Sequence, residues 1–393
     1  MAIPKKSRLV LVLAATLLFL VLFLVKVKNE MHDFQVNYTA GLRLGQGETI
    51  YRPWKPDPGW ENDGHWQFKY SPFSALVYLP LSFLPMAAAK GVWYALILVS
   101  IGTLIGVSLK LAAFEADQAV LGAFLSFLIL AKLFLRELQL GQINAVITAI
   151  LMVMTWLLVK HEDAPSPGGE GTAGLLWGLA AALKPYAVIF LPYFILKRKW
   201  RALAAGTTVL AASLFVPALF YGVQGNWTVI REWVTSLSES TSALITSQDN
   251  VSLLACLNKW TENSTFAVIL FGAAVALLAV LTLVFILRGK SAPRPAVMEC
   301  ALLIVFIPLL SPLGWDYTFL SAFLAVVLIL RHFAVFPRPW KILLTIDLAV
   351  IALSLYDLLG RRLYGQFMSW SVPTVNFLII VVALFYLRMK RTA

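Results

Sequence analysis

A lysine inside an apolar stretch is the clearest sign of chemistry in this sequence. Lys184 stands near the middle of the apolar residues 173–196 and is followed at once by Pro185. A charged side chain inside a bilayer costs about 2.5–3.5 kcal/mol on insertion scales, so it needs an anionic partner or a water-filled cavity. The proline breaks the helix and frees backbone groups that also need partners. These residues predict a site for an anionic group such as a lipid phosphate; the alternative is a structural ion pair with Asp316 or Glu299.

Three further polar side chains stand at the edges of apolar segments. Gln142 and Asn144 open the apolar run 143–159, where amides without partners cost free energy. They could bind neighbouring helices, which is the commoner role of amides in membranes, or line a polar cavity reached from outside. Asp33 lies just beyond the first apolar run, 9–25, and could be a carboxylate solvated at a helix end or a functional acid.

Aromatic residues gather in the same polar stretches. Tyr38, Tyr51 and Tyr70 belong to the first long loop, and Trp315 and Asp316 stand in a turn between two apolar segments. Aromatic rings anchor proteins at the membrane interface, and they also make platforms on which sugars stack. The turn could equally be a simple connection with a capping aspartate.

The composition defines the scaffold that must hold these residues. Of the 393 residues 60% are hydrophobic and only 13% are charged, which excludes an ordinary water-soluble enzyme, a disordered chain, a collagen and a coiled coil. We expect an all-α polytopic membrane protein with about eleven to twelve transmembrane or re-entrant helices. After the first run, the expected apolar segments are 90–110, 119–135, 143–159, 173–196, 202–221, 266–287, 297–310, 318–330, 341–359 and 372–388.

The charges predict an orientation. Sixteen lysines and arginines, with no acidic residue among them, fall in five short segments: 1–8, 197–201, 288–296, 331–341 and 388–391. The positive-inside rule then places both termini in the cytoplasm and the two long polar loops outside. The net charge of +12 therefore marks orientation and does not indicate a nucleic-acid partner.

This orientation divides the chain into five parts. Lysines rather than a cleavage site follow the first apolar run, so we expect an uncleaved helix. The parts are a first transmembrane helix (1–28), an extracytoplasmic loop with a juxtamembrane helix (29–89), a transmembrane core (90–221), a second extracytoplasmic loop (222–265) and C-terminal transmembrane helices (266–393).

One ambiguity concerns residues 72–85, which are apolar but barely long enough to cross. If they cross the membrane, residues 173–196 cross once as a kinked helix. If they lie along the outer interface, residues 173–196 form a re-entrant hairpin that turns at Lys184 and Pro185. We favour the hairpin, because it brings the polar residues onto one side.

Several kinds of chemistry lack their sequence signals. No glycine-rich phosphate loop or nucleotide fingerprint follows a strand pattern, and no cluster of histidine, cysteine and carboxylate has metal-ligand spacing. Cys256 and Cys300 are too few for a disulfide framework. We therefore expect neither a metal nor another cofactor, and an activated substrate that arrives through the bilayer.

Six short motifs, in order along the chain, resemble those of glycosyltransferase family 87, which belongs to the GT-C superfamily of multi-spanning transferases. They are Asp33-Phe34-x-Val36-x-Tyr38-x-Ala40, Gly45 with Tyr51, Tyr70-x-Pro72, Gly141-Gln142-x-Asn144, Leu183-Lys184-Pro185 with the basic residues 197–201, and Ser311-Pro312-x-x-Trp315.

The resemblance implies a GT-C-like bundle and an enzyme of the bacterial inner membrane. It would move one sugar, mannose by analogy, from a polyprenyl-phosphate donor to an extracytoplasmic glycolipid or glycan, with inversion. It maps a general base onto Asp33. A lysine and amides can stabilise a leaving phosphate, so we expect Lys184, Gln142 and Asn144 to bind the donor phosphate.

The acceptor or the sugar is expected to contact five residues of the outer loops: Tyr38, Tyr51, Tyr70, Trp315 and Asp316. One departure from the family pattern stands nearby. Family members often carry a histidine soon after the Ser-Pro-x-x-Trp motif, where this chain has Asp316 and Tyr317.

Three alternatives remain open at this point. A lipid or solute transporter or flippase would use Lys184 as an anion site near the midplane, although the two halves show no internal repeat. A non-catalytic scaffold would tolerate substitution of the polar residues. Another GT-C enzyme could transfer a pentose instead of mannose.

Overall fold

The chain is almost entirely helical. The computed structural model describes residues 17–52, 67–114, 116–164, 168–287 and 294–390. Within these ranges the β-type pairing is limited to an isolated bridge between Asn250 and Trp315. The expected all-α, multi-spanning class is confirmed.

Helices of two kinds follow one another along the chain. Residues 17–25 are helical, and the rest of the expected first span lies outside the described residues. The α-helices that follow are α2 (His32–Gly45), α3 (Ala75–Tyr78), α4 (Met86–Leu111), α5 (Ala116–Leu140), α6 (Asn144–Asp163), α7 (Gly169–Leu183), α8 (Phe190–Leu196), α9 (Trp200–Phe215), α10 (Ala218–Leu244), α11 (Leu253–Thr261), α12 (Ser264–Leu287), α13 (Pro295–Leu310), α14 (Phe323–Arg331), α15 (Arg338–Leu353), α16 (Tyr356–Ser369) and α17 (Val372–Met389). Short 3-10 helices join them: η1 (Val27–Asn29), η2 (Pro72–Ser74), η3 (Pro80–Phe83), η4 (Pro185–Ile189), η6 (Asp316–Ala322) and η7 (Phe333–Val335).

The number of uninterrupted spans is smaller than the number of apolar segments. Among the described residues five helices are long and apolar enough to cross a membrane: α4, α5 from Gln118, α6, α12 and α17. Two further pairs would each make a bent span, α9 with α10 at 84° and α15 with α16 at 107°. Broken and short helices therefore make up much of the expected eleven to twelve segments.

The described parts of the two segments expected to be loops are largely helical. Residues 29–89 contain α2 and the short helices η2, α3 and η3, and residues 222–265 contain most of α10 together with α11. Residues 72–85 form three short helices instead of one continuous span. Polar turns and prolines, with Pro80 among them, interrupt the helical hydrogen bonding in these segments.

Residues 173–196 fold back on themselves. The helix α7 ends at Leu183, Lys184 is extended, and η4 and α8 return alongside it. The Trp177 indole nitrogen donates to the carbonyl oxygen of Ala187 (2.8 Å), and the Trp177 ring lies 5.0 Å from that of Phe194. The hairpin reading is therefore the one that the structure shows, because a single kinked helix would carry these residues apart.

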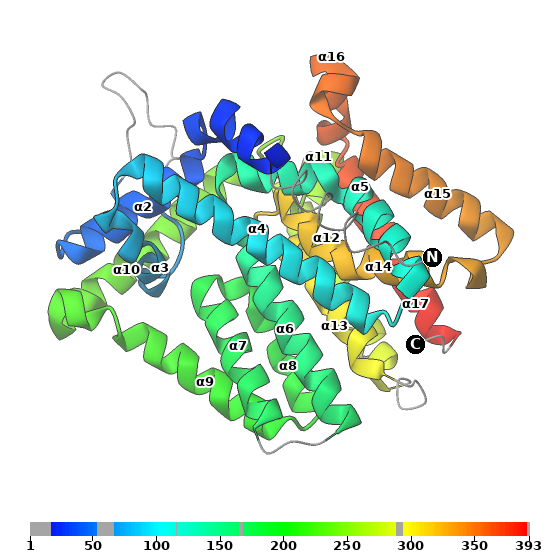
Figure 1. The fold of residues 1–393 in the computed structure, drawn as a ribbon, viewed down its shortest axis with the longest axis horizontal. Helices are drawn as coiled ribbons and strands as arrows, with labels where there is room; N and C mark the ends of the chain where they lie inside the picture. Colours follow the sequence, from blue (N-terminus) through cyan, green and yellow to red (C-terminus); the bar gives the residue numbers. More distant parts are fainter. Residues whose placement is uncertain (1–16, 53–66, 115, 165–167, 288–293, 391–393) are drawn as a thin grey trace.

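Small residues let the hairpin pack closely against α9. A Cβ atom on Gly174 would lie 2.1 Å from the carbonyl oxygen of Ala202, and one on Gly178 would lie 2.5 Å from that of Gly206. Such contacts between backbones are a common way in which membrane helices associate. In Figure 1 these helices form one part of the bundle, with α4 crossing it and α13 to α17 making up the other part.

Two of the basic segments, those that carry Lys197 and Arg388, meet at one end of the bundle. Glu299 accepts from both Lys197 and Arg388 at 2.7 Å. Lys199 pairs with Glu162 at 3.1 Å, at the last turn of α6. The other end of α6 begins at Asn144, twenty residues earlier, so about 30 Å separates the basic end from the site end of the bundle.

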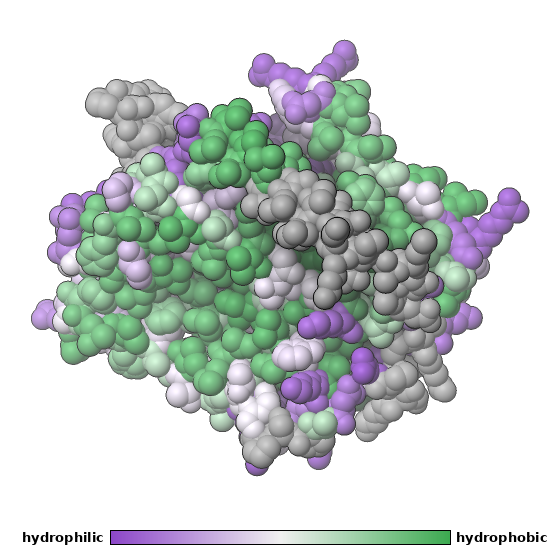
Figure 2. Space-filling model, in the orientation of Figure 1, coloured by the Kyte–Doolittle hydropathy of each residue, from purple (hydrophilic) through white to green (hydrophobic). Residues whose placement is uncertain are grey.

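The outer surface of the bundle is apolar. Figure 2 shows hydrophobic side chains over much of the visible face and hydrophilic ones mainly at its edges. The helix α12 is the least covered of these spans, since only 11% of its most apolar 18-residue stretch is buried inside the protein. Exposed side chains such as Ile269 (62%) and Leu277 (60%) could not face water over such an area without strong cost, so this surface belongs in lipid.

Candidate active site

A polar cluster joins the predicted base to three residues from distant parts of the chain. The amide nitrogen of Gln142 donates to a carboxylate oxygen of Asp33 (2.5 Å) and, more weakly, to the hydroxyl oxygen of Tyr317 (3.4 Å). The Tyr70 hydroxyl donates to the amide oxygen of Gln142 (3.0 Å). We call Asp33, Tyr70, Gln142 and Tyr317 the polar cluster. Gln142 is its centre and fixes the direction in which Asp33 points.

The end of α5 positions Asp33. Gly141 terminates that helix with a φ of +69°, and a Cβ there would lie 2.7 Å from Phe34 and 2.9 Å from the Met31 side chain. Glycine is favoured here because it adopts positive φ freely and lets α2 approach closely. The Met31 backbone N–H donates to the carbonyl oxygen of Gln139 (2.8 Å), which docks the first turn of α2 on α5. Asp33 lies in that first turn.

The surroundings of Asp33 favour a carboxyl that holds its proton longer than usual. Burial raises the pKa of Asp33, and the hydrogen bond from Gln142 is the largest effect that lowers it again. The positive charges of Arg136 and Lys69 act in the same direction as Gln142. Burial also raises the pKa of Tyr70 well above its usual value, so Tyr70 stays a phenol that donates to Gln142.

Lys184 lies at the tip of the hairpin with its ammonium directed at Asn144. Its Nζ donates to the amide oxygen of Asn144 (2.7 Å) and lies 4.9 Å from the ring of Tyr186 and 5.4 Å from that of Tyr70. The side chain is only 8% exposed. Since Tyr70 contacts both Lys184 and Gln142, the lysine adjoins the polar cluster.

Two serines hold the hairpin in place. The Ser71 hydroxyl donates to the carbonyl oxygen of Ala182 (2.6 Å), and the Ser74 hydroxyl donates to that of Leu183. These are terminal carbonyls of α7, which have no helical partners because the helix ends at Leu183 and Lys184 is extended. The segment that carries Tyr70 therefore also caps the helix that carries Lys184.

Glu137, a residue to which the sequence pattern gave no role, completes the environment of Lys184. Glu137 is fully buried, and its carboxylate accepts from the Asn144 amide (2.9 Å) and from the backbone N–H of Ala145 (2.8 Å). We call Lys184, Asn144 and Glu137 the lysine cluster. A carboxylate near the end of an apolar segment was a signal for it, because such a group needs a partner.

The alternative considered for Lys184, a structural ion pair with Glu299 or Asp316, is not present in the structure. Glu299 binds Lys197 and Arg388 at the basic end of the bundle. The Asp316 carboxylate accepts from the backbone N–H of Tyr317 (2.7 Å). The acidic groups that act on Lys184 are Glu137 and, more weakly, Asp33.

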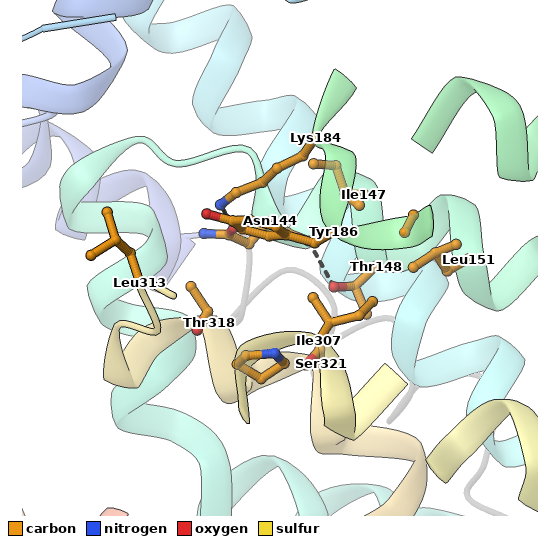
Figure 3. Close-up of a pocket in the computed structure, with 12 residues that line it drawn as sticks. Asn144, Ile147, Thr148, Leu151, Lys184, Tyr186, Ile307, Leu313, Thr318 and Ser321 are labelled. Carbon is orange, nitrogen blue, oxygen red and sulfur yellow. Dashed lines mark hydrogen bonds between the residues drawn. The ribbon is translucent and has the colours of Figure 1, made fainter. Parts of the chain in front are cut away.

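A cavity of about 30 Å³ lies beside the lysine cluster. Figure 3 shows Lys184 and Asn144 at one end of it and apolar side chains from α6 and α13 around the rest. Among these apolar side chains lie the hydroxyls of Thr148, Thr318 and Ser321, each of which donates to a backbone carbonyl. The lining residues are Asn144, Ile147, Thr148, Leu151, Lys184, Tyr186, Ala187, Ile307, Pro308, Leu313, Thr318 and Ser321. The lining is therefore polar at the end that carries Lys184 and Asn144 and mainly apolar elsewhere.

The remaining predicted site residues are not all brought together. The Tyr38 hydroxyl donates to the carbonyl oxygen of Leu84 (2.8 Å), and the Tyr51 hydroxyl donates to that of Tyr70 (2.8 Å). Both tyrosines thus support the loop, and Tyr51 positions Tyr70. Their contact with a sugar stays a prediction.

The turn that carries Trp315 and Asp316 is fixed by the second predicted loop. The buried Asn250 accepts from the backbone N–H of Gly314 (3.0 Å) and donates to the carbonyl oxygen of Pro312 (3.0 Å). Trp315 and Asp316 are partly exposed beside Tyr317, which belongs to the polar cluster. The sequence pattern gave no role to Tyr317.

In the described ranges no three histidine, cysteine, aspartate or glutamate side chains are grouped so that they could hold a metal ion. The side chains of the two clusters can take a proton at a carboxylate and stabilise negative charge with an ammonium and amides.

Two glycosyltransferases of known activity are similar in sequence to this chain. A polyprenol-phosphate-mannose-dependent alpha-(1-2)-phosphatidylinositol pentamannoside mannosyltransferase of Mycolicibacterium smegmatis is 27% identical over 164 residues, which are 40% of this chain and 36% of that protein. An alpha-(1->3)-arabinofuranosyltransferase of Corynebacterium glutamicum is 23% identical over 307 residues, 77% of this chain and 68% of the relative.

A solved structure and a family model also match. The crystal structure of ArnT from Cupriavidus metallidurans bound to undecaprenyl phosphate is 13% identical and aligns over 99% of this chain and 79% of its own, with a TM-score of 0.43. The model of glycosyltransferase family 87 matches residues 68–312, a region that contains Tyr70, Gln142 and Lys184. Because this match covers more than half of the chain, the protein belongs to glycosyltransferase family 87.

Proposed function

We propose that this protein transfers one sugar from a polyprenyl-phosphate donor to a hydroxyl group of a glycolipid or glycan acceptor. The observation that carries the proposal is the contact between the two clusters: Tyr70 hydrogen-bonds to Gln142, which holds Asp33, and its ring also faces the Lys184 ammonium. A base and a phosphate-binding cation are the two groups that this reaction needs. Family membership supports the same reaction class.

Mannose is the proposed sugar, and a pentose is the second candidate. The mannosyltransferase relative has a polyprenol-phosphate-mannose-dependent activity. The other relative is an arabinofuranosyltransferase, so a match of this kind does not by itself select the sugar.

The proposed location is the outer side of a bacterial inner membrane, with both termini in the cytoplasm. The basic segments that carry Lys197 and Arg388 gather at one end of the bundle, and the positive-inside rule favours the cytoplasm for that end. The helix α6 leads from there to the lysine cluster, so the site would face the extracytoplasmic side.

The mechanism we propose is a single displacement. The acceptor hydroxyl oxygen attacks the anomeric carbon while the bond from that carbon to the phosphate oxygen breaks. Asp33 takes the proton of the attacking hydroxyl, a kind of catalysis typically worth 10²–10⁴-fold. The polyprenyl phosphate leaves as a monoester dianion beside Lys184, and the configuration of the anomeric carbon is inverted.

This assignment gives the amides different tasks from those expected. Gln142 holds Asp33, so it would position the base instead of binding phosphate. Asn144 accepts from Lys184 and would position the ammonium. Donor phosphate binding would then fall chiefly to Lys184.

The test is transfer of radiolabel from polyprenyl-phosphate [¹⁴C]mannose or [¹⁴C]arabinose to envelope lipids by the purified protein in detergent. Asp33→Asn preserves the shape of the side chain, which can still accept from Gln142. The transfer rate of this variant should nevertheless be at least about 100-fold lower than that of the wild type. The control is Asp357→Asn, an exposed aspartate of α16.

Two outcomes would contradict the proposal. Binding of the donor without any labelled product would indicate a carrier, which is the transporter reading. Transfer by Asp33→Asn at the rate of the control variant would show that Asp33 is not the base.

A further inference from the structure

Glu137 is a buried acid that the proposed mechanism does not use. It lies in the last turns of α5, its side chain is inaccessible, and both carboxylate oxygens accept hydrogen bonds from N–H donors. Acceptance at both oxygens is the pattern of an ionised carboxylate. One donor is the backbone of Ala145, in the first turn of α6, where the helix dipole also favours a negative charge.

The contacts of Glu137 reach Lys184 through a single amide. Asn144 gives its NH₂ group to Glu137 (2.9 Å) and offers its oxygen to the Lys184 ammonium (2.7 Å). The amide therefore has one orientation that satisfies both neighbours, since the reverse would set an NH₂ group against the ammonium. Glu137 is thus the negative charge that acts most strongly on Lys184.

We propose that Glu137 is a positioning residue that limits how tightly Lys184 holds a lipid phosphate, so that the polyprenyl phosphate product can leave. The inference rests on the proposed function. After transfer the product carries more negative charge than the donor did, so a bare buried ammonium would bind the product more tightly than the substrate. A fixed carboxylate near that ammonium repels both, and it repels the dianionic product more.

The expected size follows from the electrostatics of one charge. A unit charge several ångströms away, at the effective dielectric constant of about 20 that describes partly buried pairs, changes the affinity of an anion by about tenfold or more. The direction in which the affinity changes distinguishes a counter-charge from a residue that only supports the fold. A residue that only supports the fold would weaken binding when it is altered, whereas loss of a counter-charge strengthens it.

The experiment measures binding of undecaprenyl phosphate to the purified protein in detergent, together with steady-state transfer. Glu137→Gln keeps the shape and removes the charge. It should lower the Kd for undecaprenyl phosphate about tenfold, and kcat and the donor KM should fall together because release of product becomes slow. Glu162→Gln, the same change at the basic end where Glu162 pairs with Lys199, should leave the Kd unchanged.

A second variant keeps the inference testable if Glu137→Gln does not fold. Asn144→Asp sets a carboxylate directly against the ammonium. This carboxylate shares a proton with Glu137, so the negative charge of the pair moves closer to Lys184 and the Kd should rise severalfold. Unchanged or weaker binding by folded Glu137→Gln protein, or unchanged or tighter binding by Asn144→Asp protein, would overturn the inference and leave the proposed function intact. A wild-type protein that binds no undecaprenyl phosphate would instead overturn the proposed function.

Discussion

Replacing Gln142 by leucine should move the pH dependence of the enzyme in a known direction. Asp33 must be ionised to act as a base, so activity is lost as the pH falls through its pKa. Burial raises that pKa, and the 2.5 Å hydrogen bond from Gln142 lowers it by favouring the ionised form. Leucine removes the bond, so the pKa of Asp33 rises further and the acid limb of the pH–rate profile moves to higher pH.

The size of this movement can be estimated from the bond. Hydrogen bonds to charged groups contribute about 1.5–3 kcal/mol, and about 1.4 kcal/mol corresponds to one pH unit. Asp33 is partly exposed, so solvent screening favours the lower end, and we expect a movement of about one pH unit. The variant should also lose activity at the optimum, because Gln142 no longer fixes the direction of the carboxylate.

The assay is kcat/KM for the donor measured from acid to neutral pH with the wild type, with Gln142→Leu and with Gln366→Leu, an exposed glutamine of α16. The control should follow the wild-type profile. An acid limb of Gln142→Leu that stays in place or moves to lower pH would refute the reasoning, since Gln142 would then not be stabilising the ionised base.

Three further substitutions have defined outcomes. Lys184→Met should raise the donor KM by about tenfold or more in initial-rate measurements, whereas Lys110→Met at the exposed end of α4 should not; equal values would remove the lysine from the donor site. Gly141→Ala should destabilise the protein by about 1–3 kcal/mol in thermal unfolding, because a Cβ would strain a positive φ and meet Phe34; an unchanged Tm would contradict this packing. Ser71→Ala leaves the Ala182 carbonyl without a donor and should cost about 1–2 kcal/mol by the same measurement, and a neutral result would mean that another group caps α7.

Much of the scaffold follows from simple signals in the chain. Helices α4, α5, α6, α12 and α17 lie where uninterrupted apolar runs predict them, because length and hydropathy alone decide a span. The positions and angles at which helices are interrupted are harder to predict from the sequence. The bend of 84° between α9 and α10 follows Pro217 inside the expected run 202–221, and its angle depends on tertiary packing that a hydropathy pattern does not contain.

The polar residues of the candidate site stand out in the sequence, but most of the contacts between them do not. Lys184 and Asn144 were assigned to one phosphate site, and they are in direct contact. The pairing of Gln142 with Asp33 was missed, because 109 residues separate them and nothing local links the two. Glu137 was missed because an acid beside Arg136 reads as a solvated helix end, and only the fold shows that its carboxylate points inward.

The most direct test of the central claim, that Asp33 and Lys184 serve one reaction, is a structure of the Asp33→Asn protein with an intact polyprenyl-phosphate sugar bound. The account predicts a phosphate oxygen within about 3 Å of the Lys184 ammonium, with the anomeric carbon on the side that faces residue 33. A phosphate held instead among the basic residues near Lys197, or a sugar directed away from residue 33, would contradict it.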